Sequence, residues 1–419
     1  KSSLGNKINM AAEFLSEEFK HGSAGFCPAR LTRISPWLKR YVDEKKLPFA
    51  HVAVLRKGQL AYSNFYGVRD IEEGSPVVED GIYRIYSMTK LVTTVAALAL
   101  YEKGAFQLDD PVDKFVDEFR DARVFISGKK DSINSIEAET PMTIRQLMNH
   151  TSGLTYGAFD PGPVGQLMRS GKIDFGNLQA NLGDTVRRLA SIPLCFQPGT
   201  QWRYGVSTDV LGYVIEVVTG KTLLQVFDEL IFKPLNMNDT FFEVPINKVK
   251  KFCSLYTRTK SESLKLLECA GSSRFCKPVN MYSGGGGLIS SMRDYLVFLE
   301  MIRCGGRYDD VQILGRKTVE LMLRNHLSGD MASMGQPTFS EMPMEGIGFG
   351  LGGAILLDPA KAQILGSEGE FTWGGMASTA FWIDPKEELS VVFMTQLIPS
   401  SCYPIRRELR VLVYQALVD

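Results

Sequence analysis

Residues 82–104 read IYRIYSMTKLVTTVAALALYEKG. A short apolar run at residues 82–86 ends at Ser87, and residues 88–103 have a largely apolar composition that suits a helix. Gly104 is suited to end this helix, because glycine adopts a left-handed backbone at low cost. The stretch therefore predicts a strand that ends at Ser87 and is followed directly by a buried helix.

Ser87 and Lys90 are the first candidates for chemistry. Residues three apart share a helix face, so Lys90 can place its amine beside the Ser87 hydroxyl. A serine hydroxyl is a poor nucleophile and needs a base within reach, and the amides of a first helical turn favour developing negative charge. A lysine becomes a useful base when desolvation or a neighbouring cation lowers its pKa from about 10.4. The alternative is an N-capping serine with a surface lysine, but a solvent-facing lysine is less expected in so apolar a helix.

Two further segments carry candidate site residues. Tyr204 follows a turn at residues 197–200, and its phenol can share a proton with Lys90 and Ser87. The alternative for Tyr204 is a half-buried tyrosine bonded through its hydroxyl. Residues 371–376 read FTWGGM just before a predicted strand. Paired glycines let a backbone approach a ligand closely, so an amide there can serve an oxyanion hole, unless the glycines form only a bend.

Other polar motifs point away from alternative chemistries. His150 lies in a turn-like stretch and the chain has no G-x-S-x-G elbow, so His150 is expected to be structural. The glycines at 284–287 lack the Lys-Ser/Thr of a phosphate loop. The four histidines are far apart and the seven cysteines are scattered, so no metal site is predicted. The cysteine pattern fits a reducing compartment such as the cytoplasm or an organelle lumen. Cys269 and Cys276 are expected to be two thiols, and the alternative is a disulfide between them.

Strand-like segments lie toward both ends of the chain. Strands are expected at residues 50–56, 59–66, 348–357, 363–368, 377–384 and 389–395. Helices are expected at residues 33–46, 143–149, 184–191, 208–219, 291–303 and 404–418. Residues 159–181 have weak periodicity and are expected to form a long surface loop. This order predicts one sheet built from both termini and a helical insertion at about 105–280, whose loops should provide most of a substrate pocket.

The composition is that of an ordinary globular protein. The 419 residues include 47 Lys plus Arg and 47 Asp plus Glu, so the formal charge is zero. That balance removes the broad electrostatic reason to expect nucleic acid or an anionic membrane as a partner. No stretch reaches the roughly 18 consecutive apolar residues of a membrane span, and a removed presequence would leave no trace here. We expect a soluble protein whose partner is a small molecule, with its oligomeric state left open.

In order and spacing, these elements resemble the serine β-lactamase and penicillin-binding-protein superfamily, which carries S-x-x-K, a second polar motif and K-T-G. The nearer resemblance is to class C β-lactamases and family VIII carboxylesterases, from about residue 31 to the C-terminus. Further landmarks agree in order: LDDPV at 108–112, HTSGL at 150–154, GY at 212–213, and SGGGGL at 283–288 followed by DY at 294–295.

The resemblance implies a fold and a set of roles. The fold would be α+β, an antiparallel sheet flanked by helices plus a mostly helical domain, with the site between them. The sheet domain would comprise residues 1–86 and 285–419, and the helical domain residues 87–284. Ser87 would be the acylated nucleophile, Lys90 its proton partner and Tyr204 the tyrosine of the second motif. The backbone amides of Ser87 and Met376 would form the oxyanion hole, and no metal or cofactor is implied.

Two departures from the family pattern bear on the substrate. Val206 stands where class C enzymes have the Asn of Tyr-x-Asn, and Trp373 replaces the Lys of K-T-G, followed by Gly374 and Gly375. Both lost groups help to hold a β-lactam, and the esterase relatives commonly carry Trp-Gly-Gly. The sequence therefore favours hydrolysis of small carboxylic esters. The alternatives are a β-lactamase, D-peptidase or transacylase with the same Ser87-Lys90-Tyr204 site, and a catalytically silent scaffold of the same fold.

Overall fold

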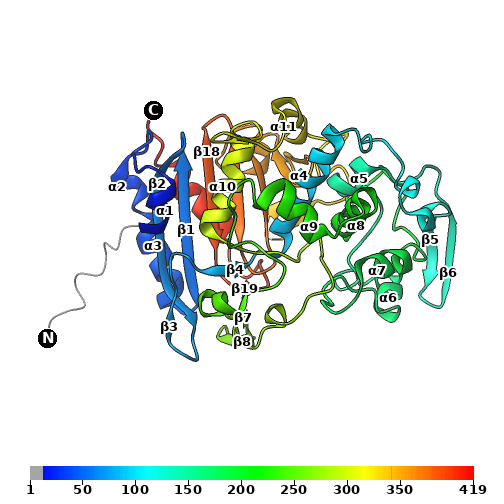
Figure 1. Cartoon of the computed structure of the whole chain (residues 1–419), viewed down its shortest axis with the longest axis horizontal. Helices are drawn as coiled ribbons and strands as arrows, with labels where there is room; N and C mark the ends of the chain where they lie inside the picture. Colours follow the sequence, from blue (N-terminus) through cyan, green and yellow to red (C-terminus); the bar gives the residue numbers. More distant parts are fainter. Residues whose placement is uncertain (1–12, 341) are drawn as a thin grey trace.

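The computed structural model describes residues 13–340 and 342–419, and its main feature is one antiparallel sheet (Figure 1). The strand order is β14-β15-β16-β17-β18-β1-β2-β3. The strands from the N-terminal part are β1 (Phe49–Arg56), β2 (Gln59–Asp70) and β3 (Ser75–Pro76). Those from the C-terminal part are β14 (Ile347–Phe349), β15 (Ala354–Leu356), β16 (Phe371–Gly374), β17 (Ala380–Asp384) and β18 (Leu389–Met394). Because β1 pairs with β18, the prediction of one sheet built from both ends of the chain is confirmed.

Helices cover both faces of this sheet. All eight residues of β1 are buried, because alternate side chains enter the cores on the two sides. Val52 and Val54 pack in the core that includes α3 (Ile34–Asp43) and α13 (Ile405–Tyr414). Ala53 and Leu55 belong to the larger core with α4 (Thr89–Glu102) and α10 (Met292–Arg303). The fold is therefore the β-lactamase-like α+β arrangement that the resemblance implies.

The helical part packs around α4 and α8 (Ser207–Thr219), which contact each other. Every residue of α4 from Thr89 to Leu100 is buried, as its apolar composition predicts. Around these two helices lie α5 (Ile144–Asn149), α7 (Leu182–Leu189) and α9 (Leu223–Phe227). The helix α6 (Pro163–Ser170) packs against β5 (Arg123–Lys129). The hairpin of β5 (Arg123–Lys129) and β6 (Ser132–Glu137) lies at the end of the molecule opposite the N-terminal strands (Figure 1).

Small β elements fix the segments around the site. β4 (Ile82–Arg84) pairs with β9 (Ile289–Ser291), so the strand before Ser87 lies beside the strand after the glycine turn at 284–287. A three-stranded sheet is formed by β7 (Leu255–Arg258), β8 (Leu264–Glu268) and β19 (Leu397–Ile398). Two further hairpins are β10 (Arg307–Tyr308) with β11 (Val311–Gln312), and β12 (Thr338–Phe339) with β13 (Met342–Pro343).

Short helices complete the fold. They are α1 (Glu13–Glu18), α2 (Pro28–Leu31), α11 (Arg316–Met322), α12 (Pro359–Ala362), and the turns η1 (Tyr86–Met88), η2 (Val112–Lys114), η3 (Asp117–Phe119), η4 (Asp228–Phe232), η5 (Ile246–Lys251) and η6 (Arg274–Cys276). The division into residues 1–86 with 285–419 and residues 87–284 stays a prediction.

Three sequence predictions of elements are wrong. Residues 159–181 are not a plain surface loop, because they contain α6 and bury Met168, Ile173 and Phe175. Residues 348–357 form two strands rather than one, joined by a glycine-rich turn. Residues 363–368 are not a strand: the Asp358 side chain caps α12 just before them, and the chain regains extended structure only at Phe371.

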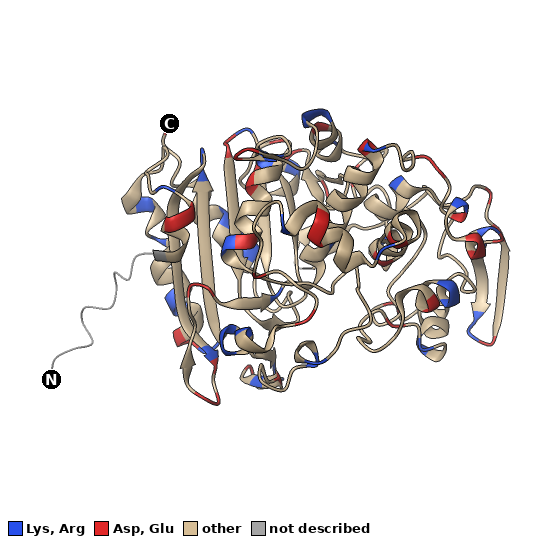
Figure 2. Cartoon of the chain, in the orientation of Figure 1, with Lys and Arg blue, Asp and Glu red and all other residues tan. Residues whose placement is uncertain are grey.

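The distribution of charge follows the balance of the composition. Lys and Arg positions and Asp and Glu positions are interspersed along the ribbon in the view of Figure 2. Within the described residues, no single helix is long and apolar enough to cross a membrane. One strongly bent pair, Ser207–Thr219 with Leu223–Phe232, passes the same test of length and composition.

Candidate active site

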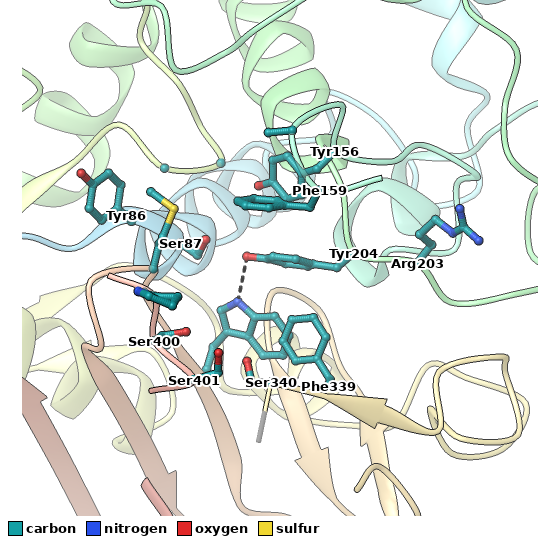
Figure 3. Close-up of a pocket in the computed structure, with 18 of the residues that line it drawn as sticks. Tyr86, Ser87, Tyr156, Phe159, Arg203, Tyr204, Phe339, Ser340, Ser400 and Ser401 are labelled. Carbon is teal, nitrogen blue, oxygen red and sulfur yellow. Dashed lines mark hydrogen bonds between the residues drawn. The ribbon is translucent and has the colours of Figure 1, made fainter. Parts of the chain in front are cut away.

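Ser87 lies where three local features meet. β4 ends at Arg84, η1 spans Tyr86–Met88, and α4 begins at Thr89, so the serine sits at the strand–helix junction that the sequence predicts. Tyr86 has a φ of +40°, a sparsely populated conformation for a residue other than glycine. This kink is held by packing, because the Tyr86 side chain is buried edge-on against Phe275. Ser87 faces a cavity of about 1280 Å³ (Figure 3).

Lys90 is buried directly beside the serine, with 1% of its surface exposed. Its Nζ lies 3.3 Å from Ser87 Oγ, 2.7 Å from Tyr156 Oη and 2.7 Å from the Gly285 carbonyl oxygen. A neutral amine has two N–H donors and one lone pair. If the amine donates to Tyr156 and Gly285, its lone pair is left for the Ser87 proton. This is the geometry that a general base for a serine nucleophile requires.

Tyr156 is a site residue that the sequence does not predict. Its hydroxyl bonds Lys90, the role predicted for Tyr204. Burial, followed by the charges of Tyr204 and Asp209, raises the pKa of Tyr156 well above its usual value, so it remains a neutral phenol. Its one sequence signal is its position, two residues after the HTSGL landmark.

Tyr204 meets Lys90 with its ring face rather than with its hydroxyl. Lys90 Nζ lies 4.6 Å from the ring centre, within the range of a cation–π interaction. The Tyr204 hydroxyl accepts a hydrogen bond from the indole Nε1 of Trp373 at 3.2 Å (Figure 3). Tyr204 also belongs to an aromatic cluster with Trp202, Phe339 and Trp373.

Gly374 and Gly375 bring the end of β16 against the segment that leads to Ser87. A Cβ at Gly375 would lie 2.5 Å from the Ile85 carbonyl oxygen, so a side chain there would push the two segments apart. Ser87 and Met376 both line the cavity, where their backbone amides are the candidate oxyanion donors.

Val206 is not brought to the cavity. It lies in the hydrophobic core with 3% of its surface exposed and is absent from the residues that line the cavity. The Val206 position therefore offers no contact to a substrate in this structure.

Asp209, in the first turn of α8, is a second residue of the site that the sequence does not predict. It is 1% exposed, and its Oδ1 accepts hydrogen bonds from Ser283 Oγ at 2.5 Å and from the Gly285 amide at 3.1 Å. Burial raises the pKa of Asp209, while the positive charge of Lys90 and both hydrogen bonds oppose that rise. No local sequence pattern pairs Asp209 with a glycine turn 76 positions away.

His150 and the glycine turn have the positions of supporting elements. His150 caps the end of α5 in the left-handed conformation and packs behind Tyr204, with ring centres 4.9 Å apart. Burial and the Lys90 charge lower the pKa of His150 well below its usual value.

Among the described residues, no group of three or more His, Cys, Asp or Glu side chains could hold a metal ion.

The walls of the cavity are mostly apolar on two sides. The helical part contributes Phe125, Phe159, Val164, Phe175 and Leu178. The opposite wall comes from segments before and within the C-terminal strands, and includes Phe339, Met342, Met344, Ile347 and Leu356. The cavity is therefore shaped for a small molecule with apolar groups on either side of its reactive centre.

Comparison with known proteins finds similarity along most of the chain. The Beta-lactamase family model matches residues 34–415. Esterase EstB of Burkholderia gladioli is 32% identical over 379 residues, which cover 87% of this chain and 89% of that protein. Lovastatin esterase of Penicillium rubens is 27% identical over 374 residues, which cover 85% of this chain and 90% of that protein.

Solved structures give the same similarity over nearly the whole chain. EstCE1, a hydrolase with promiscuous acyltransferase activity, has a TM-score of 0.79 at 28% identity, covering 92% of this chain and 99% of its own. Simvastatin synthase LovD from Aspergillus terreus has a TM-score of 0.76 at 26% identity, covering 93% of this chain and 98% of its own.

Proposed function

The chain belongs to the β-lactamase family of serine hydrolases, and from this premise we propose that it hydrolyses small carboxylic esters through an acyl-enzyme on Ser87. The observation that carries the proposal is the buried amine of Lys90, placed between Ser87 Oγ, Tyr156 Oη and the Gly285 carbonyl. Esterases among its relatives support the choice of ester.

The reaction has two halves. Ser87 Oγ attacks the ester carbonyl while its proton passes to Lys90, and the oxyanion lies between the amides of Ser87 and Met376. The carbon–oxygen bond to the alcohol then breaks, and the alcohol leaves with the proton from Lys90. Water attacks the acyl-enzyme in the same way, with Lys90 again accepting and returning the proton. The acid is released and Ser87 is restored.

Trp373 is the feature that favours a neutral ester over a β-lactam. Its indole carries no charge, and its N–H donates to Tyr204. A charge-assisted hydrogen bond contributes roughly 1.5–3 kcal/mol and a neutral one about 1 kcal/mol. Loss of that difference costs on the order of tenfold in the binding of an anionic substrate. Val206 supplies no contact to either kind of substrate, because it is buried in the core and does not line the cavity.

One experiment tests both the reaction and the substrate class. We expect kcat/KM for p-nitrophenyl butyrate to exceed that for a chromogenic cephalosporin, and a fluorophosphonate probe to label Ser87. The folded Ser87→Ala variant should lose labelling and several orders of magnitude in ester turnover. A cephalosporin value equal to the ester value would favour the β-lactamase alternative. Near-normal turnover by Ser87→Ala would remove Ser87 as the nucleophile.

Acyl transfer to an alcohol is a second candidate activity, because the cavity is larger than a short ester needs. EstCE1 and LovD are described as having acyltransferase or synthase activity. Adding an apolar alcohol to the ester assay should then yield a second ester at the expense of free acid. Absence of such a product at any alcohol concentration would leave hydrolysis alone.

A further inference from the structure

Asp209 and Lys90 lie on opposite sides of one glycine. Asp209 Oδ1 accepts from the Gly285 amide at 3.1 Å, and Lys90 Nζ donates to the carbonyl of the same residue at 2.7 Å. Ser283 Oγ holds the carboxylate from a third direction at 2.5 Å. The catalytic amine and the carboxylate are thus linked through the turn at 284–287.

Glycine at position 285 is required by this arrangement. A Cβ at this position would collide with Oδ2 of Asp209. A side chain there would displace either the carboxylate or the turn whose carbonyl contacts Lys90. The absence of a side chain at Gly285 therefore leaves the space that the Asp209 carboxylate occupies.

Asp209 also differs in charge from the other groups around Lys90. The titratable groups that face the amine are Tyr156, Tyr204, His150 and Asp209. Two of them are phenols, and His150 is a buried imidazole kept neutral by its surroundings. Asp209 is the carboxyl group of this set, and its charge interacts with that of Lys90.

We propose that Asp209 is a positioning residue, which holds the Gly285 carbonyl against Lys90 and whose negative charge favours the ammonium form of Lys90. The inference rests on the proposed function. When the Ser87 O–H bond breaks, the new N–H bond makes Lys90 a buried cation, and the Asp209 carboxylate stabilises that cation. The proton then leaves with the alcohol, and Asp209 itself exchanges no proton.

The Asp209→Asn variant separates charge from shape. An amide oxygen can still accept from Ser283 and Gly285, but the negative charge is gone. The measurement is the rate of inactivation by the fluorophosphonate probe, recorded from about pH 5 to about pH 10. We expect the acid limb of this pH profile to shift to lower pH by roughly one unit, because the ammonium form loses its partner. The plateau rate should fall about tenfold, since proton transfer to Lys90 becomes less favourable.

Asp294→Asn is the matched control. Asp294 is also the third residue of its helix and is also 1% exposed, but it accepts from the Asp239 amide and Thr240 Oγ1, and it does not line the cavity. Its variant should leave the acid limb where it is in the parent protein. An equal shift in both variants would show a general effect of net charge and overturn the inference.

The remaining outcomes are also decisive. An unmoved acid limb in folded Asp209→Asn overturns the role of Asp209 while leaving the proposed function intact. If the probe fails to label the parent protein, the proposed function itself fails. Should Asp209→Asn not fold, Ser283→Ala replaces it, because loss of the hydroxyl donor disfavours the carboxylate form. A smaller shift in the same direction supports the inference, and no shift in folded Ser283→Ala overturns it.

Discussion

At the scale of residues, the phenols of Tyr156 and Tyr204 flank Lys90. Of these two, only the Tyr156 hydroxyl lies within hydrogen-bond distance of the Lys90 amine, whereas the Tyr204 hydroxyl is bonded by Trp373. Tyr156→Phe should therefore slow acylation by about 100-fold, at the lower end of what general acid–base groups contribute. Tyr204→Phe keeps the ring over Lys90 and loses the bond from Trp373, so its acylation loss should be smaller. The pre-steady-state burst with p-nitrophenyl butyrate measures both rates.

Residues that act as a unit have non-additive effects. Acylation by the Lys90→Ala/Tyr156→Phe double variant should therefore be little slower than acylation by Lys90→Ala alone. The acylation rate of Tyr204→Phe is the comparison. Multiplicative losses for Lys90 and Tyr156 would show that they act separately. A larger loss for Tyr204→Phe than for Tyr156→Phe would restore Tyr204 as the hydroxyl partner.

The sequence can predict contacts within one helical turn but not those made by distant loops. Ser87 and Lys90 are three residues apart, so a helix start alone brings them together. Tyr156 is 66 residues from Lys90, and its contact depends on how the segment after α5 packs. The family resemblance predicts that Trp373 lies near the site, but its bond to Tyr204 depends on how segments 169 residues apart pack together.

At the scale of elements, the segment around α6 forms both a cavity wall and part of the core. Phe159 is 68% exposed and Phe175 is 6% exposed, yet both line the cavity. Phe159→Ala should change the preference among p-nitrophenyl esters of different chain length with little loss of stability. Phe175→Ala should cost about 3–5 kcal/mol, as for other buried phenylalanines.

Chain-length profiles and thermal unfolding of the two variants measure this difference. A large fall in melting temperature for Phe159→Ala with unchanged preference would make residue 159 structural. Deletion of the whole segment would be uninformative, because it would remove the buried side chains together with the exposed one.

Helices are predictable where a strong apolar or amphipathic pattern is bounded by residues that start or end a helix. The apolar stretch of α4 and the amphipathic α10 match their predicted ranges within one or two residues at each end. The sequence does not predict the hairpin β5–β6, because its two strands are mostly exposed and show little alternation of apolar and polar residues. α12 was missed although Asp358 before Pro359 is a helix-start signal, because a four-residue helix has no periodicity to detect.

At the scale of the whole molecule, His51 lies at the centre of the sheet that joins the two ends of the chain. It is fully buried in β1, beside Met394 of β18 and Phe65 of β2. Its Nδ1 lies 2.9 Å from Tyr83 Oη, and its Nε2 has no partner among the described residues. Burial lowers the pKa of His51 to about 3.

This burial predicts a specific loss of stability in acid. Below about pH 6.5 the unfolded chain binds a proton at His51 that the folded protein does not bind until about pH 3. The free energy of unfolding should therefore be fully retained above about pH 6.5 and fall by about 1.4 kcal/mol per pH unit below it. His51→Asn cannot titrate, and its amide takes the place of Nδ1 and can still bond Tyr83, so it should lack this part of the slope. Between about pH 7.5 and about pH 5, urea unfolding should show the parent protein losing about 2 kcal/mol more than the variant.

His150 and the carboxylates are common to both proteins, so their contributions cancel in the difference. Equal losses in the two proteins would mean that His51 is protonated within the folded sheet, and that the sheet centre opens to water well above pH 3.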